Sequence, residues 1–317
     1  LVREYTYLEN NFKSSFDTEN IALYGQYKYP FSETFDIEFG LRIESRDADY
    51  IDNNGPAPDG FFCIAIYPKP ESCLFNNEYN NSEDFWGGKI VFKNQISDNL
   101  LSYFLISKGY KPGGINIEGN VSNENLNYDS ETMINYEIGF KGNLNKNFLF
   151  QTSIFYQDRE DVQTKQSIVT SINSDEQGGL CPCSFTDYIG NAVKGSNYGL
   201  ETELIWLINN KIDLFFNLGL LETEFNNYLS FSHVDSDLEN GTPVNLNGRE
   251  QSHAPRYQLS LGINYKITDD LFIKFDIEAK DEFYFSDRHN VQSDDYVLFN
   301  LLLGYQKESW EFNIFGK

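Results

Sequence analysis

FDIEFGLRIE, residues 35–44, is the stretch of the chain that decides its fold. Phe, Ile and Leu alternate there with Asp, Glu, Gly and Arg. Because successive side chains of a β-strand point to opposite faces, this period of two predicts a strand with one apolar face and one charged face. The same pattern recurs in six further stretches, at residues 134–140, 198–206, 212–220, 257–265, 271–280 and 297–305.

The expected strands run about 10 to 14 residues, longer than the five or six of an ordinary soluble strand. At about 3.3 Å per residue and a tilt near 45°, such a strand spans roughly 25 Å, the height of the apolar band of an outer-membrane barrel. A soluble sandwich, in which two apolar faces meet in a dry core, also uses amphipathic strands. Alternation alone therefore leaves both architectures open.

The lengths of the connections separate the two architectures. Tight turns with Asn, Asp, Ser or Pro recur at 29–33, 95–99, 142–147, 207–211, 266–270 and 306–309. Long polar connections lie between them, near 51–84, 111–130, 161–192, 226–254 and 285–294. Short turns at one end and long loops at the other are typical of a transmembrane barrel. We predict an all-β, antiparallel up-and-down barrel wall of about twelve strands, with a partial strand at residues 1–5.

Composition agrees with an all-β membrane protein. Aromatic residues make up 16% of the 317 residues, nearly all of them Tyr and Phe, which favours strands over helices. No stretch approaches the roughly 18 to 20 apolar residues of a membrane-spanning helix. Aromatic clusters at 24–31 and 283–285 lie where the interfacial girdles of a barrel are expected. The net charge of −24 argues against nucleic acid as a partner, because phosphate binding requires a surplus of Lys and Arg.

The four cysteines form two local pairs in loop-like segments rich in Asn, Gly, Pro and Ser: Cys63 with Cys73, and Cys181 with Cys183. They are disulfide candidates for an oxidising compartment, and three connectivities stay open, including bridges between the two segments. A zinc site is the rival interpretation. It is disfavoured because the chain has no Cys-x-x-Cys pair and offers only three imidazole ligands, from His233, His253 and His289.

Catalytic patterns are missing from the sequence. It contains no Gly-x-Ser-x-Gly elbow and no phosphate-binding loop. Glu201 and Glu203 share one face of a strand, a spacing that would suit acid and base roles. A water-facing ladder of charges with Lys and Arg explains them more simply. We therefore expect neither an enzyme nor a cofactor.

SKGYKPGGIN, residues 107–116, ends an apolar strand and enters a long loop. Its two consecutive glycines after Pro112 permit a turn with positive φ. The segment resembles the Ser-Arg-Gly-Tyr-Lys-x-Gly-Gly-aromatic-Asn signature of TonB-dependent receptors of the siderophore type. Lys108 and Ile115 depart from that signature, which has Arg and an aromatic residue there. The matching positions are Gly109, Tyr110, Lys111, Gly113, Gly114 and Asn116.

Further matches follow in the family's order and extend the resemblance over nearly the whole chain. Two strand motifs contain the matching residues Glu137, Gly139 and Lys141 and then, after Asn-Ala-Val-Lys at 191–194, Gly199, Glu201 and Glu203. The closing hairpins resemble the family at Arg249, Ala254, Pro255 and the strand at 299–305. The resemblance implies that these residues are barrel scaffold around an interior lined with ionic pairs. It transfers no ligand-binding residue.

The resemblance also implies a barrel of about 22 strands that is filled by an N-terminal plug. Residues 1–317 would then be one domain, an incomplete barrel of about 12 to 13 strands without the plug and the last strand. The implied partners are outer-membrane lipid, the TonB complex and a small molecule such as a ferric siderophore or other metal chelate. The resemblance also implies a monomer located in the bacterial outer membrane. The alternatives are a passive or enzymatic outer-membrane barrel and a soluble all-β carbohydrate-binding module.

Overall fold

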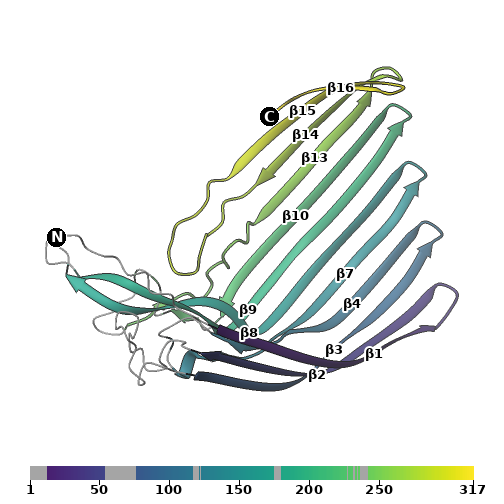
Figure 1. Cartoon of the computed structure of the whole chain (residues 1–317). Helices are drawn as coiled ribbons and strands as arrows, with labels where there is room; N and C mark the ends of the chain where they lie inside the picture. The colour runs from purple at the N-terminus through teal and green to yellow at the C-terminus, as the bar shows by residue number, and fades with distance from the viewer. Residues whose placement is uncertain are drawn as a thin grey trace, which may run out of the picture.

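The computed structural model describes residues 13–53, 76–116, 121, 123–174, 180–226, 228–230, 233, 235 and 242–317. Its main feature is one antiparallel sheet of twelve strands (Figure 1). In order across the sheet, the strands are β1 (Lys13–Pro30), β2 (Phe35–Asn53), β3 (Asn76–Ser97), β4 (Leu100–Lys111), β7 (Glu131–Asn145), β8 (Phe148–Ser174), β9 (Leu180–Asn209), β10 (Ile212–Asn226), β13 (Tyr257–Lys266), β14 (Leu271–Lys280), β15 (Tyr296–Lys307) and β16 (Trp310–Gly316).

Short elements occupy the connections between the long strands. β5 (Gly114–Ile115) pairs with β6 (Asn127–Tyr128), and one turn of 3-10 helix, η2 (Asn123–Asn125), comes just before β6. β11 (Leu229–Ser230) pairs with β12 (Val244–Asn245). Among the described helices, none has the length and apolar character needed to cross a membrane.

The six tight turns lie at one end of the sheet, the turn end, and the long connections at the other, the loop end (Figure 1). Asn145 Oδ1 accepts a hydrogen bond from the Asn147 amide at 2.9 Å, and Asn209 Oδ1 accepts one from the Lys211 amide at 2.8 Å. Thr268 Oγ1 accepts one from the amide three residues later at 3.0 Å. These side chains replace the backbone partners that a turning chain loses. The prediction of six hairpins from turn residues is confirmed.

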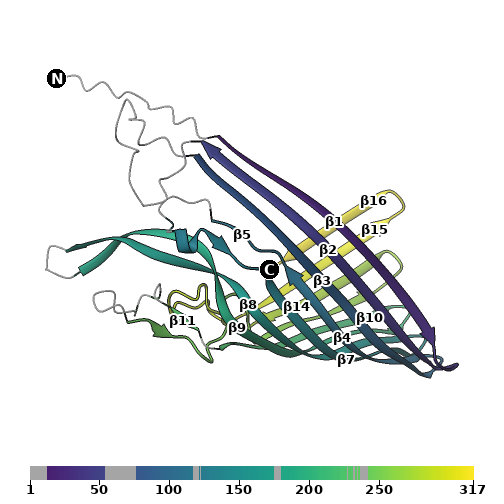
Figure 2. The ribbon, with the colours of Figure 1, turned by 90° about the horizontal axis from the view of Figure 1, so that it is seen from below.

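The sheet curves into an open trough, which Figure 2 shows from below. β1 and β16 are its two outer strands, and among the described strands each has a single neighbour in the sheet. All the other long strands pair antiparallel on both sides. The alternation and the turns predict this up-and-down antiparallel wall, and the resemblance implies that the barrel is incomplete.

The two faces of the sheet differ in chemistry and in exposure. Leu23 and Ile154 belong to the apolar face and are 77% and 63% exposed. On the polar face, Glu38 and Ser153 are only 5% and 7% exposed. Side chains on the inside of a curved sheet crowd together, so the polar face is the inner one and the apolar face is turned outward. This is the arrangement of a wall surrounded by hydrocarbon and lining an aqueous interior.

The apolar face has no second layer of protein against it in the part of the chain that the structure describes. The buried apolar cluster there consists of Val162, Phe225, Tyr228 and Leu246, all at or beyond the loop end of the sheet. A soluble sandwich requires two sheets that share a core between their apolar faces. The alternative of a soluble carbohydrate-binding module is therefore wrong for this fold.

The predicted connection at 161–192 is wrong for most of its length. β8 continues to Ser174 and β9 starts at Leu180, and the two form a hairpin that extends beyond the sheet (Figure 1). The pairing of β8 with β9 omits Asp161, which has a left-handed backbone with φ of 54°. Asp tolerates this conformation better than most residues. The hairpin is rich in polar residues because it extends into water, and a polar composition is compatible with a strand there.

Two of the four cysteines lie in this hairpin and not in a loop, because Cys181 and Cys183 belong to β9. Cys63, Cys73 and the expected partial strand at 1–5 lie outside the described residues. The disulfide connectivity therefore stays a prediction.

An aromatic row crosses the apolar face near the loop end. Tyr136 pairs with Tyr156, and Tyr156 pairs with Tyr198 in the next strand. On β8, Asp158 and Glu160 follow Tyr156 on the same face, two and four residues nearer the loop end. A tyrosine row followed by carboxylates is typical of the boundary between hydrocarbon and headgroups.

A charged side chain on the apolar face should distinguish a membrane wall from a soluble sheet. Ile138 pairs with Ile154 near the middle of that face, and we expect Ile138→Arg to lower the free energy of unfolding in lipid vesicles by about 2–4 kcal/mol. Urea titration followed by tryptophan fluorescence measures this change. Gln151→Arg, on the polar face of the neighbouring strand, is the matched control and should cost less than half as much. Equal effects of the two substitutions would contradict the assignment of the faces.

Candidate functional site

The long connections gather at the loop end, where side chains fix irregular backbone. Tyr110, in the segment that carries the family signature, stacks on Phe85 with ring centroids 4.7 Å apart and an angle of 7° between the planes. Its hydroxyl donates a hydrogen bond to Glu44 at 2.7 Å. Arg46 Nη1 donates to the Gly113 carbonyl at 3.2 Å. The signature segment is therefore attached to β2 and β3, although β4 has already parted from β3 at this level.

Gly113 and Gly114 are needed for close approach and not for a left-handed turn. A Cβ on Gly113 would overlap the carbonyl oxygen of Tyr128, and one on Gly114 would overlap the hydroxyl of the same tyrosine. Neither glycine uses the positive φ that the sequence permits, since Gly248, with φ of 73°, is the only glycine in the described residues with that conformation. The two glycines let β5 lie directly against β6.

Asn116 attaches the same connection to the β8–β9 hairpin. Its Oδ1 accepts from the Ile189 amide at 2.7 Å, and its Nδ2 donates to the Ile189 carbonyl at 2.8 Å. Asn191 of β9 also binds this connection, because its Nδ2 donates a hydrogen bond to the Asp129 carbonyl at 2.9 Å. Asn116 is buried, so both ends of its amide need these partners.

Arg159 joins three segments on the inner face. Its Nε and Nη2 donate to Glu131 Oε1 at 2.8 and 2.5 Å, and its Nη1 donates to Gln251 Oε1 at 2.8 Å. Gln251 donates in turn to Asn197 at 3.0 Å. Glu131 is buried, and its second oxygen accepts from the Gln163 amide at 3.0 Å. This charge-assisted network holds the connection before β13 against β7 and β8.

Arg249 links the connection that precedes β13 to the connection between β14 and β15. Its guanidinium donates to the carbonyls of His289 at 2.5 Å and Ser286 at 3.2 Å and to Asn290 Oδ1 at 2.8 Å. It also lies 4.1 Å from the centroid of the Tyr284 ring. In the same connection, burial raises the pKa of Asp287, which accepts a hydrogen bond from the Ser252 amide.

Cationic groups surround the base of the β8–β9 hairpin. Asp187 pairs with Lys165 Nζ at 2.6 Å and with Arg288 Nη1 at 2.7 Å. A hollow of about 430 Å³ opens beside it, lined by Lys111, Asn116 and Gln163 among others. The arrangement offers ammonium groups, an amide and a carboxylate to a polar molecule entering from the loop end.

The strand motifs lie on the inner face of the wall. Tyr103 donates to Glu137 Oε1 at 2.5 Å, and Lys141 Nζ lies 5.6 Å from the centroid of the Tyr103 ring. A Cβ on Gly139 would overlap that ring. Three of the predicted scaffold residues therefore converge on one tyrosine of β4.

The remaining scaffold residues are less connected. Gly199 gives room to the Leu220 carbonyl and the ring of Phe155, whereas a Cβ on Gly109 would meet nothing within 4 Å. Glu201 and Glu203 share the inner face, but no described Lys or Arg is within ion-pair distance of either. The clearest ionic group in the interior is elsewhere, where Glu38 pairs with Lys89 at 2.6 Å and Lys93 at 2.5 Å.

His233 has one carboxylate close to it, with 3.6 Å between its Nδ1 and Asp235 Oδ2. In the part of the chain that the structure describes, no three His, Cys, Asp or Glu side chains are arranged to hold a metal ion. His233 instead lies against Arg249, with 3.2 Å between its Nε2 and Nη1 of the arginine. Sequence reasoning named Arg249 only as part of a motif and missed the role of Arg159. In the sequence, each of these two residues is an arginine within a polar, acidic stretch. That pattern does not show which groups the arginine binds.

The chain matches the family described as "TonB dependent receptor-like, beta-barrel" over residues 3–316. The pesticin receptors of Yersinia enterocolitica and Yersinia pestis are 23% and 22% identical to it over 291 residues. Each alignment covers 91% of this chain and 37% of the receptor, so the chain spans little more than a third of the length of these relatives.

Solved structures share the fold. The ferric yersiniabactin uptake receptor FyuA from Yersinia pestis superposes with a TM-score of 0.70 at 20% identity, covering 96% of this chain and 41% of the receptor. The ferric-catecholate import receptor Fiu from E. coli superposes with a TM-score of 0.68 at 15% identity, covering 95% and 40%.

We expect Gly139→Ala to destabilise the wall by about 1–3 kcal/mol, because the added methyl group must displace the Tyr103 ring and weaken its bond to Glu137. Gly109→Ala is the control, since its methyl group enters open space. Urea unfolding of both variants in lipid vesicles measures the difference. If the two substitutions cost the same, the close packing around Tyr103 is not important for stability.

We expect Arg249→Lys to loosen the connection between β14 and β15, because an ammonium group cannot reach the separate acceptors that the guanidinium binds. Loss of even one charge-assisted hydrogen bond should speed local amide exchange by roughly tenfold. The amides of Phe285 and Ser293, which are hydrogen-bonded within this connection, are the readout in hydrogen–deuterium exchange. Arg256→Lys, at an exposed arginine that pairs with Glu250, is the control. Unchanged exchange at both amides in Arg249→Lys would rule out this role.

Proposed function

Since this chain belongs to the TonB-dependent receptor β-barrel family, we propose that it is the wall of an outer-membrane receptor that actively imports a ferric siderophore or another metal chelate. The observation that carries the proposal is the division of the sheet into two ends. One end has only tight turns, and the other has long connections fixed to one another by buried or half-buried polar side chains. A transport receptor needs such an asymmetry, because it captures its ligand on one side of the membrane only.

The chemistry of the loop end supports a polar, multidentate ligand. Lys111, Lys165 and Arg288 are close to a hollow that also presents amide groups. Metal chelates carry carboxylate, phenolate or hydroxamate oxygens at their surface, which ammonium and amide donors recognise. The similar structures support this class, because FyuA is a ferric yersiniabactin uptake receptor and Fiu a ferric-catecholate import receptor.

The proposal includes parts of the protein beyond this domain. We propose that further strands close the barrel, that a plug fills it, and that the TonB complex drives release of the ligand by acting on the plug. A barrel of about 22 strands encloses a lumen that would leak without a plug. Proteins of this family are located in the outer membrane, and we assign the full-length protein to that membrane as a monomer surrounded by lipid.

Uptake of radioactive iron tests this function. The full-length protein is expressed in a bacterial strain that lacks its own ferric-chelate receptors, with and without a functional TonB, and is offered ferric yersiniabactin and a ferric catecholate. We expect accumulation of at least one chelate, and only in cells with TonB. Uptake that does not depend on TonB would support a passive barrel instead. Chemical alteration of the chelate by the purified protein would support an enzymatic one.

A further inference from the structure

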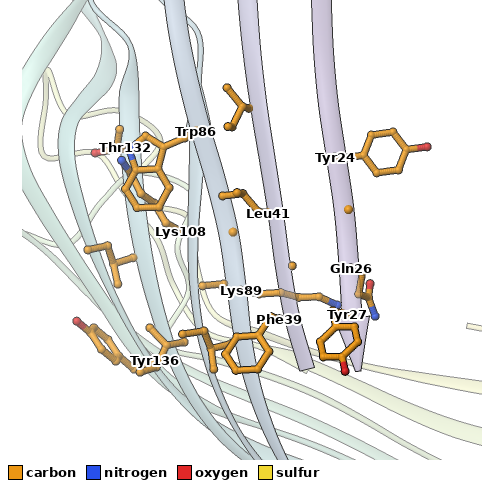
Figure 3. A pocket seen from close by; sticks show the side chains of 18 of the residues that line it. Tyr24, Gln26, Tyr27, Phe39, Leu41, Trp86, Lys89, Lys108, Thr132 and Tyr136 are labelled. Atoms are coloured by element: carbon orange, nitrogen blue, oxygen red, sulfur yellow. The ribbon is translucent and has the colours of Figure 1, made fainter. Parts of the chain in front are cut away.

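A large hollow opens on the outward apolar face where β3 parts from β4 (Figure 3). The pairing of these two strands stops at Gly88 and Lys108. Towards the loop end, β3 continues beside β2 and β4 continues beside β7, so the strands diverge. The hollow has a volume of about 1120 Å³. Beside the gap the Tyr110 ring stacks on Phe85, and the lining of the hollow includes Lys89 as well as the apolar residues of the outward face.

The floor of the hollow is apolar. Aliphatic and aromatic side chains from five strands line it, among them Leu23, Leu41, Ile90, Ile106, Ile134 and Tyr136. They are continuous with the apolar face that surrounds the wall, so in a membrane the hollow lies in contact with lipid chains. Its concave shape gives an acyl chain more contact than the flat wall does.

The rim of the hollow towards the loop end is charged. Lys108 Nζ lies 3.9 Å above the centroid of the Trp86 ring, and the two side chains lie together in Figure 3. Across the rim, Glu160 is paired with Lys194 at 2.8 Å. Lys108 has no ion pair with any carboxylate of the described residues. Its ammonium group is therefore a cation at the edge of an apolar surface, supported by an indole ring and available to an anion.

The depth of Lys108 fits the level of lipid headgroups. Ile106 pairs with Tyr136. Lys108 is two residues nearer the loop end on the same strand, level with Ile134 and Asp158. The tyrosine row that begins at Tyr136 marks the boundary of the hydrocarbon, so Lys108 lies just beyond it.

We propose that this hollow binds one phosphate-bearing lipid of the outer leaflet, with acyl chains on the apolar floor and the phosphate at Lys108. The proposal rests on the placement of the wall in the membrane and not on the nature of the imported ligand. Of the two lysines that line the hollow, Lys89 is already paired with Glu38 at 2.6 Å. Free phosphate is not the ligand, because without acyl chains it would have only Lys108 to hold it, with Asp158 and Glu160 nearby to repel it.

Native mass spectrometry of the detergent-solubilised full-length protein tests the proposal. The probes are phosphatidylglycerol and phosphatidylcholine with the same acyl chains, because they differ in net charge only at the headgroup. We expect the protein to retain one phosphatidylglycerol roughly fivefold more than phosphatidylcholine, and Lys108→Gln to remove that preference. Lys141→Gln, which removes a lysine from the inner face, should leave the preference unchanged.

Two results would overturn the proposal: equal retention of the two lipids by the unchanged protein, or an undiminished preference in Lys108→Gln. Resistance of each variant to unfolding in detergent shows whether the barrel has formed. Trp86→Leu is a second variant that keeps the floor apolar and removes the support of the Lys108 ammonium, and it should weaken the preference partially. Binding of the ferric chelate is measured in the same samples and should not change, so failure of the lipid site is distinguishable from failure of the import function.

Discussion

The structure depends on one constraint, the need of every backbone amide and carbonyl in hydrocarbon for a hydrogen-bond partner within the protein. The long strands between β1 and β16 meet this need by pairing with a neighbour on each side, and the sheet needs no second layer to do so. The apolar side chains can then remain exposed on the outside, as Leu23 and Ile154 are. The inner face is free to carry groups such as Glu38 and Ser153 that no soluble core would accept in such numbers.

Beyond the membrane the same need is met differently. The connections at the loop end are irregular, so their backbone groups depend on side chains. Asn116 binds both the amide and the carbonyl of Ile189, and Arg249 binds the carbonyls of His289 and Ser286. Each of these side chains joins segments that are distant in the sequence. The loop end of the wall is therefore organised by a few long polar side chains and not by an apolar core.

Much of the wall could be predicted from the sequence, because its strands have two different faces and its turns need particular residues. The alternation at 35–44 and the turn residues near Asn145 and Asn209 act locally, so they are visible in one dimension. The β8–β9 hairpin was missed because a strand that leaves the membrane has water on both faces and loses its alternation.

The site was less accessible to prediction. The family signature marked Tyr110 and the two glycines after Pro112, but their roles depend on Glu44, Phe85 and Tyr128, which come from other parts of the chain. Glu201 and Glu203 carry the expected charge on the expected face. Whether a charged residue finds an opposite charge depends on strand register and side-chain reach, and neither can be read from spacing within a single strand.

The left-handed residue in β8 has a consequence for where the protein meets water. On the membrane side of Asp161, even-numbered residues such as Ile154 and Tyr156 point outward. Val162 continues the same count, yet it is buried against Phe225 on the interior side. Asp161 thus reverses which face of the sheet the following side chains of β8 occupy. The apolar side chain of Val162, which would otherwise point outward at the level of the headgroups, points to the interior instead. A single backbone conformation, the left-handed φ of Asp161, therefore adapts β8 to the change from membrane to water.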